Sequence, residues 1–92
     1  MIRTLRCKET EGIFRRQHSR KFANIALIAR RKLRMLDAAD RLEDLAAIPG
    51  NRLEAMKGSR RGQYSTRIND QWRVCFVWRA RAAEDVEIID YH

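Results

Sequence analysis

Two runs of alternating apolar and polar residues, separated by a short polar turn, constrain the fold of this chain most. Residues 63–68 and 72–78 each alternate with the period of two that is typical of β-strands. A three-residue turn at residues 69–71 places Ile68 opposite Trp72 and gathers the large apolar side chains on one face. A two-residue turn would move one set to the other face, so the pattern favours the longer turn, with an asparagine or aspartate in the left-handed conformation.

The same register places Arg67 directly opposite Arg73 on the other face of the hairpin. Like charges that face each other on a sheet repel. An anion held between or above the two guanidinium groups would remove this repulsion. Alternatively, each arginine points into solvent or pairs with a carboxylate, for which Asp70, Asp90 and Glu54 are the candidates.

Before the hairpin, the apolar residues recur with the period of an α-helix. We expect a first long helix capped by Ser19, then a short second helix over residues 42–48 that is capped by Asp40 and ended by Pro49 and Gly50. Spacings of three and four place one apolar set on a single face of the first helix: Phe22, Ile25, Ala29, Leu33 and Leu36.

Four shorter segments complete the predicted fold. Residues 2–6 alternate as a short strand, and residues 15–21 indicate a short helix and a solvated loop. Residues 86–89 predict a last strand after a polar connection at residues 79–85. The sequence therefore predicts a single α+β domain, residues 1–92, with two N-terminal helices packed on a small antiparallel sheet.

The charge of the chain indicates an anionic partner. Its 92 residues carry a formal net charge of +8, and such an excess favours nucleic acid through counterion release. A membrane is disfavoured because no apolar run of about 18 residues is present. The basic residues of the first helix fit either a helix lying along RNA or a protein partner, or the solvated back of a core helix: Arg30, Arg31, Lys32 and Arg34.

The sequence contains none of the common motifs for binding a metal or a nucleotide. Cys7 and Cys75 belong to no CxxC pattern, so we expect no zinc site, and two free thiols without a signal peptide fit the cytosol. No glycine-rich phosphate loop, HExxH motif or nucleophile elbow is present. We therefore expect no cofactor and no metal.

Cleavage of RNA without a metal needs few protein groups, and the chain offers them. The 2′-hydroxyl of RNA is the nucleophile, so the protein has to move protons and stabilise negative charge on phosphorus. Lys57, Arg67 and Arg73 are suitable cations, and His92 is a suitable proton-transfer group. Asp90 can share that role, and Tyr91 can stack on a base. The alternative is that the last three residues fray, as chain ends often do.

Several segments closely resemble the HigB-type toxins of the RelE/ParE superfamily. They are residues 51–58 (NRLEAMKG), residues 64–76 (YSTRINDQWRVCF), residues 87–92 (EIIDYH) and the first five residues (MIRTL). The resemblance implies the RelE-like α+β fold and a ribosome-dependent mRNA endonuclease that blocks translation. It also implies a HigA-type helix-turn-helix antitoxin as partner, with operator DNA bound only through the toxin–antitoxin complex, and a cytoplasmic location.

The resemblance also implies an active site. Five residues match the family's catalytic pattern, namely Lys57, Arg73, Asp90, Tyr91 and His92. Arg67 fits the basic residues that line the site, and Arg60 and Arg61 are expected to meet the RNA backbone.

Glu54 departs from this pattern, because some family members carry a histidine there. A carboxylate at Glu54 can act as a base or pair with Lys57 or an arginine, but it cannot be a cation at the phosphate. Two other hypotheses stay open. One is a toxin of the superfamily that poisons gyrase, and the other is an RNA-binding module without catalysis.

Overall fold

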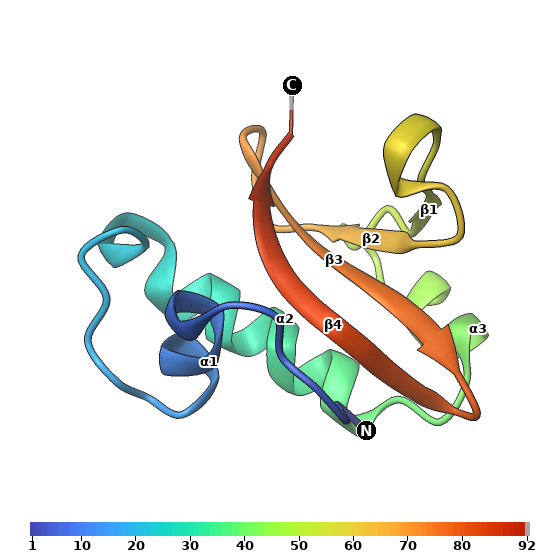
Figure 1. The fold of residues 1–92 in the computed structure, drawn as a ribbon, viewed down its shortest axis with the longest axis horizontal. Helices are drawn as coiled ribbons and strands as arrows, with labels where there is room; N and C mark the ends of the chain where they lie inside the picture. The colour runs from blue at the N-terminus through green and yellow to red at the C-terminus, as the bar shows by residue number, and fades with distance from the viewer. Residues whose placement is uncertain (92) are drawn as a thin grey trace.

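The helices and the sheet come from successive parts of the chain. The computed structural model describes residues 1–91 (Figure 1). The first part forms three α-helices and a 3-10 turn: α1 (Lys8–Phe14), η1 (Ala23–Ile25), α2 (Ala26–Ala38) and α3 (Leu42–Ala46). The second part forms four strands and a 3-10 turn: β1 (Glu54–Ala55), η2 (Gly58–Arg60), β2 (Tyr64–Arg67), β3 (Trp72–Arg79) and β4 (Ala82–Asp90).

The strands form one antiparallel sheet in the order β1-β2-β3-β4, and α1 and α2 lie against one face of it (Figure 1). The predicted α+β layout is therefore confirmed. The core between the two layers joins the expected helix face to the apolar face of the hairpin. All five residues predicted for that helix face are buried, as are Ile68, Val74 and Phe76.

The predicted hairpin register is confirmed, and the conformation of its turn is not. Arg67 pairs with Arg73 in the register, and the amide of Ile68 donates to the carbonyl of Trp72 over 2.9 Å. The expected left-handed residue is wrong, because none of residues 69–71 has a positive φ. Instead the Asn69 side-chain oxygen accepts from the amides of Gln71 (2.9 Å) and Trp72 (2.8 Å), which closes the turn.

The first long helix begins later than expected. Ser19 Oγ accepts from the Phe22 amide at 3.3 Å, but the chain then makes the turn η1, and α2 begins only at Ala26. The ring of Phe22 packs edge-on against Trp72 with centroids 5.3 Å apart. Phe22 thus reaches the core from a turn rather than from the helix itself, which the spacing of apolar residues could not distinguish.

Two other helix predictions need correction. The short helix near the N-terminus precedes the basic run instead of lying in it, because the Thr10 amide donates to Cys7 Sγ (3.4 Å) and caps α1 there. The second predicted helix is α3, and Asp40 is not its cap. The Asp44 carboxylate accepts from the amides of Asp40 (3.2 Å) and Arg41 (3.1 Å) and closes the first turn from within.

The strand predictions also need correction at the sheet edges. Residues 2–6 form no continuous strand and make two parallel bridges to β4, at Ile2 and Leu5. The predicted polar connection is mostly strand: β4 begins at Ala82, after a turn in which Ala80 and Arg81 have φ of 52° and 63°. The polar residues there point outward and form ion pairs, such as Arg79 with Glu84 (2.8 Å). Within residues 1–91, no helix has the length and apolar character that crossing a membrane requires.

Asn51, after the turn that ends α3, ties the helices to the sheet. Its side chain is 1% exposed, donates to the Leu45 carbonyl over 3.1 Å and accepts from Lys32 Nζ over 2.6 Å. Its own carbonyl accepts from the Arg67 amide at 2.6 Å. The side chain of Asn51 therefore joins α2 to α3, and its main-chain carbonyl joins both helices to β2.

Replacement of Asn51 by alanine should therefore destabilise the protein. It removes two side-chain hydrogen bonds, one of them to a charged group, and we expect a loss of about 2 kcal/mol. For a domain of this size the melting temperature should fall by roughly 8–16 °C, as measured by circular dichroism. Asn24→Ala is the matched control, since Asn24 is an exposed asparagine on η1 and its replacement should cost less than about 0.5 kcal/mol. Equal melting curves for the two variants would contradict the role given to Asn51.

Candidate active site

Arg73 lies at the centre of the candidate site and is held by the protein itself. It is 6% exposed, on the face of β3 that points away from the helices. Its Nε donates to Ser65 Oγ over 2.7 Å, and its Nη2 donates to the carbonyls of Arg52 (2.5 Å) and Ser65 (3.3 Å). Arg52 has a φ of 45°, and its turned backbone aims that carbonyl at Arg73. The positive charge of the Arg73 guanidinium therefore lies just beneath the surface of the candidate site.

Tyr91 covers Arg73. The guanidinium carbon lies 5.5 Å from the centre of the Tyr91 ring, within cation–π range. The Tyr91 hydroxyl donates to Glu54 Oε1 over 2.8 Å, and its amide donates to the Gln71 carbonyl over 2.7 Å. Figure 1 shows the end of β4 beside the β2–β3 turn, which provides this last contact. The C-terminal end and β1, far apart in sequence, are therefore joined above a buried positive charge.

A surface depression of about 470 Å³ opens beside this contact. Its walls are Glu54, Ala55, Met56, Lys57 and Tyr91. The Lys57 side chain is exposed and makes no hydrogen bond or ion pair within residues 1–91. The depression thus combines an unpaired ammonium group, a carboxylate and a phenol, all three of which the sequence had singled out.

Arg67, across the register from Arg73, pairs with the Asp70 carboxylate at the hairpin turn. The sequence alone left open whether an anion lies between the two arginines or each has its own partner. In the structure Arg67 pairs with a carboxylate, and Arg73 has separate partners. Lys32, on α2, donates to Asn51, and burial lowers the pKa of its ammonium group, with smaller contributions from Arg67 and Arg31. Lys32 is a cation near Arg67 whose position the sequence analysis did not anticipate.

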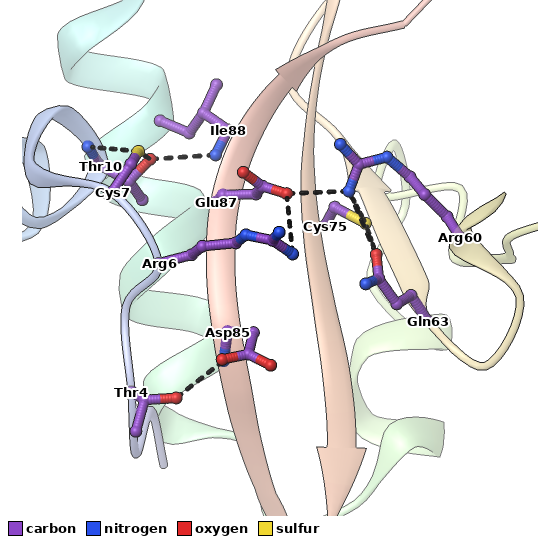
Figure 2. A network of polar contacts seen from close by, with 10 residues as sticks. All are labelled: Thr4, Arg6, Cys7, Thr10, Arg60, Gln63, Cys75, Asp85, Glu87 and Ile88. Carbon is purple, nitrogen blue, oxygen red and sulfur yellow. Dashed lines mark hydrogen bonds and ion pairs between the residues drawn. The ribbon is translucent and has the colours of Figure 1, made fainter.

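Arg60 is engaged in a network on the outer face of the sheet (Figure 2). Its Nη1 lies 2.8 Å from Glu87 Oε1, 3.2 Å from Gln63 Oε1 and 3.7 Å from Cys75 Sγ, and the hydrogen bond to Glu87 raises the pKa of the guanidinium. Burial raises the pKa of the Cys75 thiol, which donates to Gln63. Arg60 therefore anchors the loop that follows Lys57 to β4.

The remaining predicted residues lie around these groups. Arg61 is exposed just after η2, and Asp90 accepts from Gln71 Nε2 over 3.1 Å at the end of β4. His92 lies outside the described residues. The structure thus brings Glu54, Lys57, Arg73 and Tyr91 together and places Arg60 in a separate network. Sequence reasoning missed three groups: Ser65, Asn51 and the Arg52 carbonyl. Each makes hydrogen bonds to residues far away in the sequence, and such bonds leave no local sequence pattern.

The protonation of Tyr91 follows from its contact. The hydrogen bond to Glu54, and then the negative charge of Glu54, raise the pKa of the Tyr91 phenol, while Arg73 opposes them by a smaller amount. The folded-state pKa is above the unfolded value, so this contact stabilises the fold below about pH 10 and is lost as the pH rises through the folded-state value. Near neutral pH the phenol is therefore a hydrogen-bond donor and not a base.

This pKa shift can be measured directly. In a Tyr64→Phe background Tyr91 is the remaining tyrosine, and its ultraviolet absorbance should titrate above the ordinary phenol range. Glu54→Gln should bring the midpoint back toward that range, because the negative charge is gone. Glu84→Gln, at the other end of β4, should leave it unchanged. An ordinary Tyr91 midpoint in the presence of Glu54 would show that the two side chains are not in contact in solution.

Two solved structures share the fold of this chain. Two structures of YoeB–YefM toxin–antitoxin complexes from Staphylococcus aureus contain a chain that superposes with TM-scores of 0.61 and 0.62. The identities are 20% and 19%, and each match covers 100% of this chain and 98% of the other. At this identity the likeness establishes the fold, which is the predicted RelE-like one.

The family follows from the sequence match. Residues 12–92 match the model of a family described as the RelE-like toxin of type II toxin–antitoxin system HigB. The chain belongs to this family of HigB-like toxins.

Two individual relatives are similar to parts of the chain. The chain is 48% identical over 48 residues to Toxin HigB-1 of Vibrio cholerae, covering 52% of this chain, and 34% identical over 61 residues to an uncharacterised protein of Haemophilus influenzae, covering 66%. The matches span 50% and 60% of the lengths of these two relatives.

Proposed function

We propose that this toxin is an mRNA endonuclease that acts in the ribosome, by attack of the RNA's own 2′-hydroxyl and without a metal. The observation that carries the proposal is the convergence of Glu54, Lys57 and Tyr91 around one depression above the buried charge of Arg73. A proton acceptor and cations that stabilise negative charge on phosphorus are among the groups that phosphodiester transfer uses.

The reaction assigns a role to each group. The 2′-oxygen bonds to the adjacent phosphorus while its proton passes to the Glu54 carboxylate. Lys57 pairs with the negative charge that grows on the phosphoryl oxygens, and Arg73 adds its field from below. The bond from phosphorus to the 5′-oxygen then breaks, leaving a 2′,3′-cyclic phosphate, and the departing 5′-oxygen takes up a proton. His92 is proposed as the donor of that proton, with Asp90 sharing the transfer.

Tyr91 has a positioning role in this scheme. Its phenol holds Glu54 from one side, and its ring offers a surface on which a base can stack. Arg61 is exposed after η2 and is proposed to contact the RNA backbone, as is Arg67 when Asp70 releases it. The proposed partners are the ribosome with its mRNA and a HigA-type helix-turn-helix antitoxin, with operator DNA bound through the toxin–antitoxin complex. The proposed location is the cytoplasm.

The test is to map the 5′ ends of cellular mRNA after brief induction of the toxin. We expect new ends within translated regions for the wild type and a loss of these ends for His92→Ala. Cleavage should require translation, so mRNA without a ribosome-binding site should stay intact. Intact mRNA together with DNA-break signalling would instead indicate a gyrase poison, and RNA binding without new ends in either protein would indicate a module without catalysis.

A further inference from the structure

The excess positive charge of this protein is confined to one segment. Residues 12–36 contain eight of the twenty lysines and arginines and none of the twelve aspartates and glutamates. The rest of the chain then has twelve of each sign and is neutral overall. The net charge of +8 therefore belongs to the segment that contains α2 and the loop before it, and not to the candidate active site.

Part of this charge surrounds an exposed apolar side chain. Spacings of three, four and seven place Leu27, Arg30, Arg31 and Arg34 on one face of α2. Arg16 joins them from the loop after α1, and the five residues line a depression of about 300 Å³. We call this set of five residues the arginine patch. Leu27 is 71% exposed at its edge, and the next residue, Ile28, is 39% exposed.

The four arginines of the patch have no carboxylate partner within the part of the chain that the structure describes. Arg16, Arg31 and Arg34 form no ion pair with another residue among residues 1–91. Arg30 Nε donates to the Ile13 carbonyl over 2.9 Å, which fixes that guanidinium at the rim. Like charges three and four residues apart on a helix destabilise it. A partner that supplies carboxylates would turn this cost into attraction.

We infer that the arginine patch docks an acidic amphipathic segment of a partner protein, with an apolar side chain of that segment seated against Leu27 and carboxylates paired with the arginines around it. Guanidinium groups bind carboxylates through two parallel hydrogen bonds. A phosphate backbone would satisfy the charge but would leave Leu27 in water. The exposed leucine therefore favours a protein over RNA.

The arginine patch is separate from the candidate active site. The opposite face of α2, with Ala29, Leu33 and Leu36, is buried in the core, so the patch lies on the outside of the helix layer. Arg73 and Tyr91 lie beyond the sheet, on its other face. The patch shares no residue with the depression at Lys57, so the inference goes beyond the proposed nuclease function and does not depend on it.

The test uses the full chain and three labelled probes in fluorescence anisotropy. The first is a synthetic peptide with leucines at helical spacing and glutamates around them, the second is a scrambled peptide of the same composition, and the third is an oligouridine of equal charge. We expect the patterned peptide to bind at least about tenfold more tightly than the scrambled one. Leu27→Ser should weaken the patterned peptide by roughly 10-fold or more, the value of one buried leucine, and leave oligouridine binding unchanged.

Charge reversal distinguishes binding at the arginine patch from attraction of the acidic peptide to the net positive charge of the protein. Arg31→Glu with Arg34→Glu should abolish binding of the patterned peptide, while Arg81→Glu, at the exposed β3–β4 turn, should reduce it only slightly. All variants should keep the wild-type circular dichroism. Equal binding of both peptides, or no effect of Leu27→Ser, would overturn the inference. Tighter binding of oligouridine that depends on Arg31 and Arg34 alone would also overturn it and assign the patch to RNA.

Discussion

Replacing Lys57 by methionine should lower the rate of mRNA cleavage by about 10²- to 10³-fold while the melting temperature stays the same. The size follows from the loss of one charge that stabilises the transition state in a preorganised site. The unchanged stability follows from the structure, because the Lys57 side chain is exposed and has no partner among residues 1–91. Cleavage should be measured on purified ribosomes programmed with a single mRNA, with the new 5′ ends quantified over time.

Two matched variants make this result specific. Arg81→Met removes an equally exposed cation at the far end of the β3–β4 hairpin and should leave the cleavage rate within about threefold of the wild type. Lys57→Arg keeps the charge and should restore part of the rate. If Lys57→Met and Arg81→Met reduce cleavage equally, the effect is one of net charge, and Lys57 has no place in the reaction.

The hairpin could be predicted from the sequence because its register depends only on residues within the hairpin. A one-residue change of register would have exposed a whole apolar set, so the alternation alone determines the pairing of Arg67 with Arg73. The buried face of α2 was predictable for the same reason. The start of α2 was not, since the turn at η1 depends on the contact of Phe22 with Trp72, which is fifty residues away.

The sequence predicted four residues that the fold brings together, but it did not predict the contacts between them. Glu54, Lys57, Arg73 and Tyr91 were chosen from chemistry and resemblance, and the fold brings them together. The partner of Glu54 is the phenol of Tyr91, whereas the sequence offered Lys57 or an arginine. Arg60 shows the limit most clearly. As a basic residue in a loop it resembles Arg61, but Glu87 on β4 lies within 2.8 Å of it and gives it a structural role.

Arg73→Met should be the most destabilising single change in the site. It removes three hydrogen bonds and leaves two acceptors without their donor, the buried Ser65 and the partly buried Arg52 carbonyl. Each buried polar group left unpaired costs about 1–3 kcal/mol, so we expect a loss of about 3 kcal/mol in the free energy of unfolding. For a domain of 92 residues this lowers the melting temperature by roughly 12–24 °C, measured by calorimetry.

Arg67→Met is the matched control, because Arg67 faces Arg73 across the register but pairs with a fully exposed carboxylate at Asp70. Its replacement should cost less than about 1 kcal/mol. The comparison also tests the role proposed for Arg73 in mRNA cleavage. If Arg73→Met melts as the wild type does yet no longer cleaves mRNA, the guanidinium is free in solution and binds the phosphate directly. The other outcome is that Arg73→Met melts at a lower temperature and that Arg73→Lys, which keeps the charge, still cleaves poorly. In that case the guanidinium acts by holding the Arg52 carbonyl and Ser65. Through them it positions the residues that lead to Glu54 and Lys57.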